Sequence, residues 1–553
     1  MTAQRTAVAL LLAAATVFAQ QPAPAQLPTF SESVEVRVLN LDVDVTDAAG
    51  NPVTDLKKDD FSVKIGGKPV PIDYFALINE GTFHAPDLAT APPERVLSTY
   101  QQAEESAYVP RNFLIYVDTG YLPPGLRNRA LSTIRDFVTR LGPNDAVRVV
   151  LFDRAPRVLV DWTTSKELVM AELAGMEKET VGMSRLQTQE QTIAMINGFS
   201  GSRRTLSSRQ QLAQQYGQEV GAEIQDMLGS IQRELVTLTP LNGKRAFLFV
   251  SGGYEYQPGY VMAQYATGNY LPSMSNVDVR QVPERINAMI QKANEVQVTF
   301  YTVDATGLTA EGTPASEGSP ATNVLAIEQR PNLRFAAQQD RQTPLQMMAT
   351  DTGGLALLNT NDFQQGLSRI YKQVSNYYTL GITLSKLGIT GYQKVDVTVN
   401  RPGLTVRSRK GWAPMTESQK IETRALATME TDLSYHAIPA KIETAPATLD
   451  KKVYLLPITV LVPADALTFL PQGDKESARA EFYIGAIDDK GNTSPMNRQE
   501  TTFEIPAGKP KAGAFVRYAA QLQTKKGNYR IVVNVRDAQS GKMGTARTNV
   551  HVE

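Results

Sequence analysis

The chain has 553 residues, with 56 basic and 56 acidic side chains, no cysteine, and three histidines (His84, His436 and His551) far apart in sequence. The balanced charge does not indicate a nucleic-acid partner or an acidic disordered chain. The missing cysteine excludes disulfides, thiolate metal sites and cysteine nucleophiles, and the scattered histidines argue against a histidine-based zinc site.

The amino terminus, MTAQRTAVALLLAAATVFAQQ, has the pattern of a secretory signal peptide over residues 1–19. Arg5 precedes an apolar run that ends at Phe18, and this run is shorter than the roughly 20 residues of a membrane-spanning helix. We predict cleavage near Ala19 and a periplasmic or secreted mature chain, with an uncleaved anchor as the alternative. The rest of the sequence contains no apolar run of membrane length, so we expect no membrane span in the mature chain.

Residues 30–84 predict an N-terminal β-unit. Apolar and polar residues alternate between Val34 and Val45, which is the period of a half-buried strand, and Gly66-Gly67 marks a hairpin turn. A unit of this size is marginal alone, so we expect it to pair with strands from elsewhere in the chain.

Residues 110–380 predict a doubly wound α/β domain. The runs RNFLIYVD, AVRVVLFD, RAFLFVS and VQVTFYTVD are continuously apolar, as in parallel strands covered on both faces, and helical patterns lie between them at 125–141, 166–178 and 207–238. Such sheets bind ligands at the carboxyl ends of their strands, where Asp118, Asp153, Ser251 and Asp304 fall. Residues 180–235 are interpreted as a helical insertion and residues 306–343 as a loop.

The remaining sequence returns to β-strand alternation. Residues 381–415 predict strands that complete the N-terminal β-unit, residues 416–430 a short helix, and residues 441–553 an immunoglobulin-like β-sandwich with hairpin turns at DKGN and KKGN. The predicted class is α/β, with β-rich domains on both sides of the doubly wound sheet.

Several ordered blocks together resemble a bacterial family, the von Willebrand factor A-related proteins of the acidobacterial type. The resemblance covers about residues 30–415 and rests on the N-terminal strands, RNFLIYVDTG, LGPNDAVRVVLFD, GKRAFLFVSGGYE and VTVNRPGLTVRSRKGW. It implies a von Willebrand factor A-like domain used for binding, in which a metal-ion-dependent adhesion site combines D-x-S-x-S with a threonine and an aspartate from two further loops.

The chain departs from that metal pattern. Asp118 matches the first position, but Gly120 and Leu122 replace both serines and Gly252 replaces the later aspartate, while the second loop falls near residues 180–184 without a clear alignment. Because Mg²⁺ requires oxygen ligands, we expect a degenerate site without cofactor. The favoured role of Asp118 is to accept backbone N–H groups at the following helix start. The alternatives are a retained Mg²⁺ or Ca²⁺ site, or another ion geometry using Asp118, Thr119 and Glu255.

The other polar candidates favour structural roles. Asp153 and Asp304 are interpreted as turn or cap residues, and Ser251 lacks both a G-x-S-x-G motif and a nearby histidine, which argues against a hydrolase. Arg401, Arg407, Arg409 and Lys410 are interpreted as a solvated strand face.

Tyrosines cluster in residues 254–270 after the third buried strand, a segment that we name the tyrosine loop. Tyrosine is favoured at protein interfaces because it combines an apolar ring with a polar tip. We therefore predict a non-enzymatic binding protein that contacts a protein partner, with local packing of the tyrosine loop as the alternative. The predicted partner-binding residues are Tyr254, Glu255, Tyr256 and Tyr260. A Mg²⁺- or Ca²⁺-dependent adhesin is the second possibility.

Overall fold

The computed structural model describes residues 38–84, 108–179, 182–199, 203–268, 281–308, 331–384, 391–451, 453–489, 491–506, 508 and 513–553. Contacts divide the described chain into one unit within Val34–Met415 and a second within Thr416–Glu553. The predicted signal peptide lies outside the described residues, as do most of residues 85–108, which the sequence indicates to be a polar linker.

Two sheets form the β-rich part of the first unit. One has the strand order β14-β1-β12-β4-β5 and the other β15-β13-β2-β3, and both contribute to one apolar core. Strands from residues 377–412 thus pair with strands from residues 38–84, as in the pairing of Leu41 in β1 with Leu380 in β12. The bounds are β1 Val38–Thr46, β2 Phe61–Ile65, β3 Lys68–Val70, β4 Tyr74–Asn79, β5 Thr82–His84, β12 Tyr377–Thr383, β13 Gln393–Val399, β14 Thr405–Ser408 and β15 Gly411–Trp412, with a short 3-10 helix at Lys58–Asp60.

A six-stranded sheet with the order β11-β10-β9-β6-β7-β8 forms the α/β part. Every neighbouring pair is parallel except β7 with β8. The strand order reverses beside β6, because β7 and β9 flank it on opposite sides, and such a reversal opens a crevice at the carboxyl ends of the strands. The bounds are β6 Arg111–Asp118, β7 Ala146–Asp153, β8 Ala155–Thr163, β9 Lys244–Ser251, β10 Thr299–Asp304 and β11 Ala356–Leu357.

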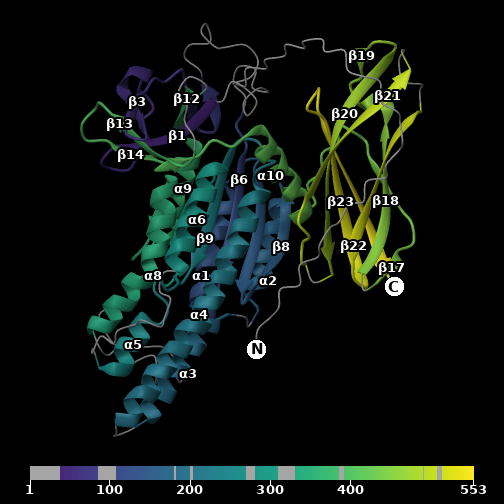
Figure 1. Cartoon of the computed structure of the whole chain (residues 1–553). Coiled ribbons are helices and arrows are strands. Elements are labelled where there is room, and N and C mark those ends of the chain that lie inside the picture. Colours follow the sequence, from purple (N-terminus) through teal and green to yellow (C-terminus); the bar gives the residue numbers. More distant parts are fainter. Residues whose placement is uncertain are drawn as a thin grey trace. The chain divides into compact units, whose positions relative to one another are not determined.

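Helices cover both faces of this sheet (Figure 1). Alternate residues of β6 enter two separate cores: Leu114 and Tyr116 pack with α3, α4, α5, α6 and α8, whereas Phe113, Ile115 and Val117 pack with α1, α2 and α9. This double burial explains the continuous apolar runs, and the mixed α/β class is confirmed. The bounds are α1 Pro124–Thr139, α2 Lys166–Met176, α3 Ser184–Gly198, α4 Arg203–Thr237, α5 Tyr260–Thr267, α6 Gln281–Glu295, α8 Pro331–Thr352 and α9 Phe363–Ser375.

The predicted helical insertion is a hairpin of α3 and α4. α4 has 35 residues and is therefore roughly 50 Å long, whereas the 8-residue strand β6 spans only about 26 Å. The hairpin consequently extends past the sheet (Figure 1). Its sheet-level part is anchored by Tyr116 and Ser230, whose hydroxyl oxygens are 2.6 Å apart.

One predicted loop in this unit was wrong, and one strand was not predicted. The interpretation of residues 306–343 as a loop fails from Pro331 onward, because α8 begins there, while 309–330 lie outside the described residues. β8 was not predicted, because most of its residues are exposed or half-buried and give no apolar pattern.

The second unit contains two sheets that share one core. β18 pairs with β16, β17 and β22 in one sheet, and β20 pairs with β19, β21 and β23 in the other, which continues to β24. α10 covers the outer face of the second sheet through Ile421 and Ala425, which pack on Tyr483. The bounds are α10 Glu417–Glu430, β16 Lys441–Thr444, β17 Thr448–Asp450, β18 Val453–Pro463, β19 Leu470–Gln472, β20 Lys475–Asp488, β21 Asn497–Pro506, β22 Phe515–Thr524, β23 Gly527–Asp537 and β24 Met543–Val552, with a 3-10 helix at Ala464–Ala466.

Among the helices that the structure describes, none combines the length and the apolar character required to cross a membrane.

Candidate functional site

The carboxyl ends of the parallel strands bring the predicted polar residues to one rim. Register places Asp118 of β6 beside Phe152 of β7 and Ser251 of β9, and Ser251 beside Asp304 of β10. The prediction that Asp118, Ser251 and Asp304 share this edge is confirmed. Asp153 lies one residue further along and pairs with Ala155 at the turn into β8.

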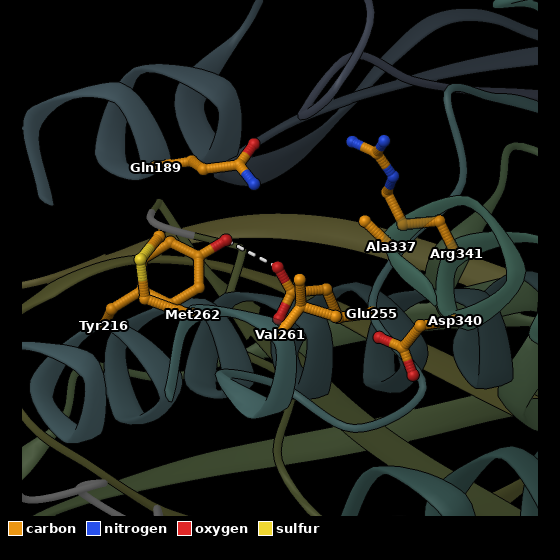
Figure 2. A pocket seen from close by; sticks show the side chains of 8 residues that line it. All are labelled: Gln189, Tyr216, Glu255, Val261, Met262, Ala337, Asp340 and Arg341. Carbon is orange, nitrogen blue, oxygen red and sulfur yellow. Dashed lines mark hydrogen bonds between the residues drawn. The ribbon is translucent and has the colours of Figure 1, made fainter. Parts of the chain in front are cut away.

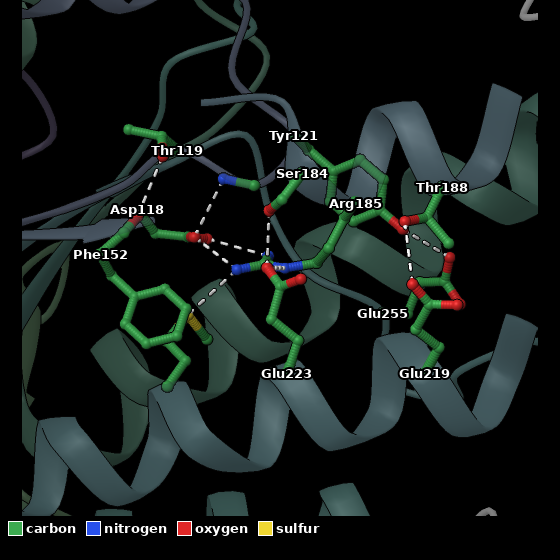
Figure 3. A network of polar contacts seen from close by, with 12 residues as sticks. Asp118, Thr119, Tyr121, Phe152, Ser184, Arg185, Thr188, Glu219, Glu223 and Glu255 are labelled. Carbon is green, nitrogen blue, oxygen red and sulfur yellow. Dashed lines mark hydrogen bonds and ion pairs between the residues drawn. The ribbon is translucent and has the colours of Figure 1, made fainter. Parts of the chain in front are cut away.

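Asp118 is fully buried and bound by an arginine (Figure 3). Arg185 donates from Nη2 to Asp118 Oδ1 at 2.5 Å and from Nη1 to Oδ2 at 3.1 Å. Ser251 Oγ donates to Oδ2 at 2.7 Å, and the Gly120 amide donates to Oδ1 at 3.2 Å. The predicted helix-start role of Asp118 was therefore wrong, because α1 begins later with Pro123 as its N-cap. Asp118 accepts one amide, from Gly120 in the loop, and its main partner is the Arg185 guanidinium.

The helical insertion places Arg185 in the crevice. Met183, in the left-handed region at φ 66°, is the N-cap of α3, and its amide donates to Thr119 O at 2.8 Å. The Leu186 amide donates to Gly120 O at 3.1 Å, so the first turn of α3 is tied to the loop after β6. This fixed turn aims Arg185 at Asp118.

A second carboxylate completes the surroundings of Arg185. Glu223 of α4 accepts from Arg185 Nε at 2.9 Å and from Ser184 Oγ at 2.8 Å (Figure 3). Burial alone would lower the pKa of Arg185, but the charges of Asp118 and Glu223 outweigh it and hold that pKa above the usual value. The guanidinium therefore stays charged.

A divalent cation does not fit beside Asp118 in this arrangement. Both carboxylate oxygens face the guanidinium, and Thr119 Oγ1 is turned away to donate to Phe152 O at 3.0 Å. Across the described ranges, no group of three or more His, Asp or Glu side chains is placed to hold a metal ion. The predicted metal residues Asp118 and Thr119 thus have other partners.

Glu255 lies in a buried hydrogen-bond network next to this ion pair. Its Oε1 accepts from Tyr121 Oη at 2.8 Å and from Tyr216 Oη at 2.5 Å, and its Oε2 accepts from the Gly259 amide at 2.7 Å. The Tyr121 ring lies 5.6 Å from the Arg185 guanidinium and 5.1 Å from that of Arg341. Glu255 therefore orders the rim loops, and both of its carboxylate oxygens accept hydrogen bonds from protein groups.

The first residues of the tyrosine loop are more buried than we expected for a partner-binding surface. Tyr254 is fully buried against Phe249 and Met348, and Glu255 is 7% exposed. A partner cannot touch these two side chains in this conformation, so their prediction as contact residues needs correction. Tyr256 and Tyr260 are half-buried and keep some surface.

Helix α8 fixes the backbone of the tyrosine loop. Pro344 has no amide hydrogen, which leaves the carbonyl oxygen of Asp340, four residues earlier, without its helical partner. The Tyr256 amide donates to this oxygen at 3.3 Å, and the Gln257 amide donates to Asp340 Oδ1 at 3.0 Å. A proline inside the helix thus provides the acceptor that fixes the loop.

A small recess lies between this loop and the hairpin (Figure 2). It has room for about one water molecule. Asp340 Oδ2 is buried there without a hydrogen-bond partner among the described residues, and burial, reinforced by the charge of Glu255, raises the pKa of Asp340 to about 7. The lining residues are Gln189, Tyr216, Glu255, Val261, Met262, Ala337, Asp340 and Arg341.

The other candidates have structural partners. Asp304 Oδ1 accepts from the amide and hydroxyl of Thr306, as a turn residue does. The predicted solvated basic face was wrong for Arg409, which is 3% exposed and donates to Asn294 O at 3.0 Å.

Sequence reasoning missed Arg185. Two signals were present: the arginine directly follows the stretch where the second loop was expected, and position 120 has no side chain. Neither signal shows that residues 67 positions apart meet.

No family model matches the chain, and no curated protein matches it at a significant level. Solved structures similar to it include a von Willebrand factor type A protein from Catenulispora acidiphila, at 8% identity over 89% of this chain and 73% of that chain, with a TM-score of 0.23. A conserved hypothetical protein, BatB, from Bacteroides thetaiotaomicron matches at 14% identity over 48% and 98%, with a TM-score of 0.23. The manganese-loaded TRAP protein of Plasmodium vivax matches at 7% identity over 55% and 95%, with a TM-score of 0.22. These TM-scores are too low to carry an argument about function.

Proposed function

We propose that the chain is a non-enzymatic protein-binding protein that acts outside the cytoplasm through a doubly wound, von Willebrand factor A-like domain without a resident metal ion. The observation that carries the proposal is the filled crevice at the carboxyl edge of the sheet. Asp118, Arg185 and Tyr121 occupy it at 3% exposure or less. The rim therefore offers a surface to a partner, whereas a substrate would need a cavity.

The chemistry of the rim supports binding over catalysis. Ser251 Oγ donates to Asp118 and accepts from the Gly253 amide at 3.0 Å, so the hydroxyl is held between structural partners. The described histidines belong to other elements: His84 to β5, His436 to an isolated bridge, and His551 to β24. The partners of Ser251 Oγ named above include no histidine, so these contacts do not assemble a Ser–His pair of the hydrolase type.

Two neighbouring features form the proposed contact surface. Tyr256 and Tyr260 keep exposed area beside the rim, and the α3–α4 hairpin presents Met195, Phe199 and Leu206 at 49%, 37% and 46% exposure. The Tyr265 hydroxyl donates to Asn197 Oδ1 at 2.6 Å, so α5 within the tyrosine loop is joined to the outer part of the hairpin. Aromatic and apolar side chains of this kind are enriched in interface cores.

Site-specific photocrosslinking tests this surface. A benzophenone amino acid placed at Tyr260, and separately at Tyr256, should give discrete adducts when the mature chain is mixed with an envelope fraction of its source organism. The control position is Leu168 of α2, which is 46% exposed on the opposite face of the sheet. Equal adducts at all three positions, or adducts only at Leu168, would contradict the proposed surface.

The proposed export has its own test. Amino-terminal sequencing of the protein recovered from the periplasm or medium should start near Gln20. A full-length amino terminus recovered with the membrane fraction would support the uncleaved anchor instead.

A further inference from the structure

We propose that the Arg185 guanidinium is the built-in cation of the rim. In this view it takes the position beside Asp118 and Glu223 that a divalent ion would otherwise take, and Gly120 makes that position available. The inference concerns how the rim is held together, and it does not depend on which partner the protein binds.

The buried charges at the rim favour this role of Arg185. Asp118 and Arg185 side chains are both 0% exposed, and Glu223 is only 16% exposed. A buried carboxylate requires a counter-charge, because an isolated charge in a protein interior is strongly destabilised. Arg185 supplies that charge to carboxylates from two separate elements, the end of β6 and α4.

The oxygen atoms near Arg185 also favour this role. Carboxylate oxygens of Asp118 and Glu223 accept from the guanidinium, and hydroxyls of Ser251 and Ser184 donate to these carboxylates. Carboxylate and hydroxyl oxygens are the ligands that Mg²⁺ and Mn²⁺ prefer. Oxygen ligands of the kind that a cation binds are thus present, but the carboxylate oxygens accept from the arginine and the two hydroxyls donate to those carboxylates.

The Arg185 guanidinium occupies the space that a side chain at position 120 would need. A Cβ atom at Gly120 would lie 2.3 Å from Arg185 Cζ, 2.5 Å from Nε and 2.7 Å from Nη2. These separations are far inside van der Waals contact, and the guanidinium could move away only by breaking its hydrogen bonds to Asp118 and Glu223. A side chain at position 120 and the Arg185 guanidinium therefore exclude one another.

A consequence follows for the serine that the resembled family carries at the position of Gly120. A serine at position 120 leaves room for a bound ion, whereas a glycine leaves room for the Arg185 guanidinium. Either cation would neutralise the buried carboxylates of Asp118 and Glu223. Because arginine is covalently attached and remains charged at accessible pH, the rim of this chain should not respond to chelators or divalent ions.

Four variants of the whole mature chain test the proposal by thermal unfolding in chelator and in millimolar MnCl₂: Gly120→Ser, Arg185→Ala, the double variant, and the control Gly125→Ser. A Cβ at Gly125 meets nothing within 4 Å. In chelator, Gly120→Ser and Arg185→Ala should each lower the Tm by roughly 4–6 °C, and Gly125→Ser by far less. The double variant should be no less stable than Arg185→Ala alone, because both changes act on the same space.

Manganese distinguishes the proposal from simple packing. The Tm of the wild type and of Gly120→Ser should be the same with and without MnCl₂, whereas the double variant should gain stability and bind Mn²⁺ detectably by electron paramagnetic resonance. A wild-type Tm that rises in MnCl₂, a Gly120→Ser chain as stable as Gly125→Ser, or strictly additive losses would each overturn the proposal. If the Arg185 variants do not fold, the comparison of the two serine variants and the wild-type manganese titration still decide it.

Discussion

Replacement of Asp340 by asparagine should remove much of the pH dependence of stability in the unit at Val34–Met415. Asp340 Oδ1 accepts the Gln257 amide, and an asparagine oxygen can do the same, so the loop contact is kept. The other carboxylate oxygen has no partner among the described residues, and the charges of Glu255 and Arg341 act on the pKa of this carboxyl in opposite directions. The substitution therefore changes the charge of the site with little change in shape.

The sign of the effect follows from the pKa. Burial raises the pKa of Asp340 from 3.8 to about 7, so the folded state keeps a proton that the unfolded state releases at lower pH. The stability contribution of the neutral carboxyl is complete below about pH 4 and is lost as the pH rises to about 7. Between about pH 5 and about pH 8, the wild type should lose roughly 2–3 kcal/mol relative to Asp340→Asn.

Differential scanning calorimetry of both proteins across this pH range measures the effect. For a unit of about 380 residues, the loss corresponds to a Tm difference that widens by about 3 °C. Parallel Tm curves for the two proteins would refute the reasoning, because they would mean that Asp340 ionises equally in the folded and unfolded states.

Three further predictions use the same measurement. Gly253→Ala should lower the free energy of unfolding by about 3 kcal/mol, because Gly253 has φ 81° and a Cβ there would lie 2.7 Å from Arg341 O. The control Gly175→Ala, in open space on α2, should stabilise the chain by about 0.5–1 kcal/mol. Equal effects of the two substitutions would contradict this prediction. Glu234→Ala should lower the free energy of unfolding by roughly 2–4 kcal/mol, because it removes a partner at 2.8 Å from the buried Arg148. The control Glu504→Ala, in the exposed pair with Lys475, should have no measurable effect. An unchanged stability of Glu234→Ala would show that the buried ion pair is dispensable. The stability of Asp44→Asn relative to the wild type should rise from about pH 4 to about pH 6, because burial raises the pKa of Asp44 to about 6 despite the charge of Arg407. A stability difference between the two proteins that does not change with pH would contradict a neutral, buried Asp44 carboxyl.

The strands of the α/β sheet could be predicted because their burial leaves a local mark. Phe113 to Val117 are all fully buried, with alternate side chains in two different cores, so the run has no polar interruption. The edge strand β8 could not be predicted in this way, since only Val160 in it is buried and the solvent-facing positions carry no pattern. The first turns of α8 were read as a loop because their composition is polar and Pro344 follows.

The candidate site was predicted only in part. The residue at the end of a buried strand is a local feature, and Asp118, Ser251 and Asp304 were placed correctly at the rim. The partner of Asp118 comes from an insertion 67 residues away, and no spacing rule connects the two. Tyr254 shows a different limit, because the apolar ring and polar tip that suit tyrosine to interfaces also suit it to a core, where it packs against Phe249.

The most direct test of the central claim is a crystal structure of the wild-type protein grown or soaked in MnCl₂, with data collected at the manganese absorption edge. The account predicts planar guanidinium density between Asp118 and Glu223 and no anomalous peak beside either carboxylate. An anomalous peak next to Asp118, with Arg185 displaced from it, would contradict the account.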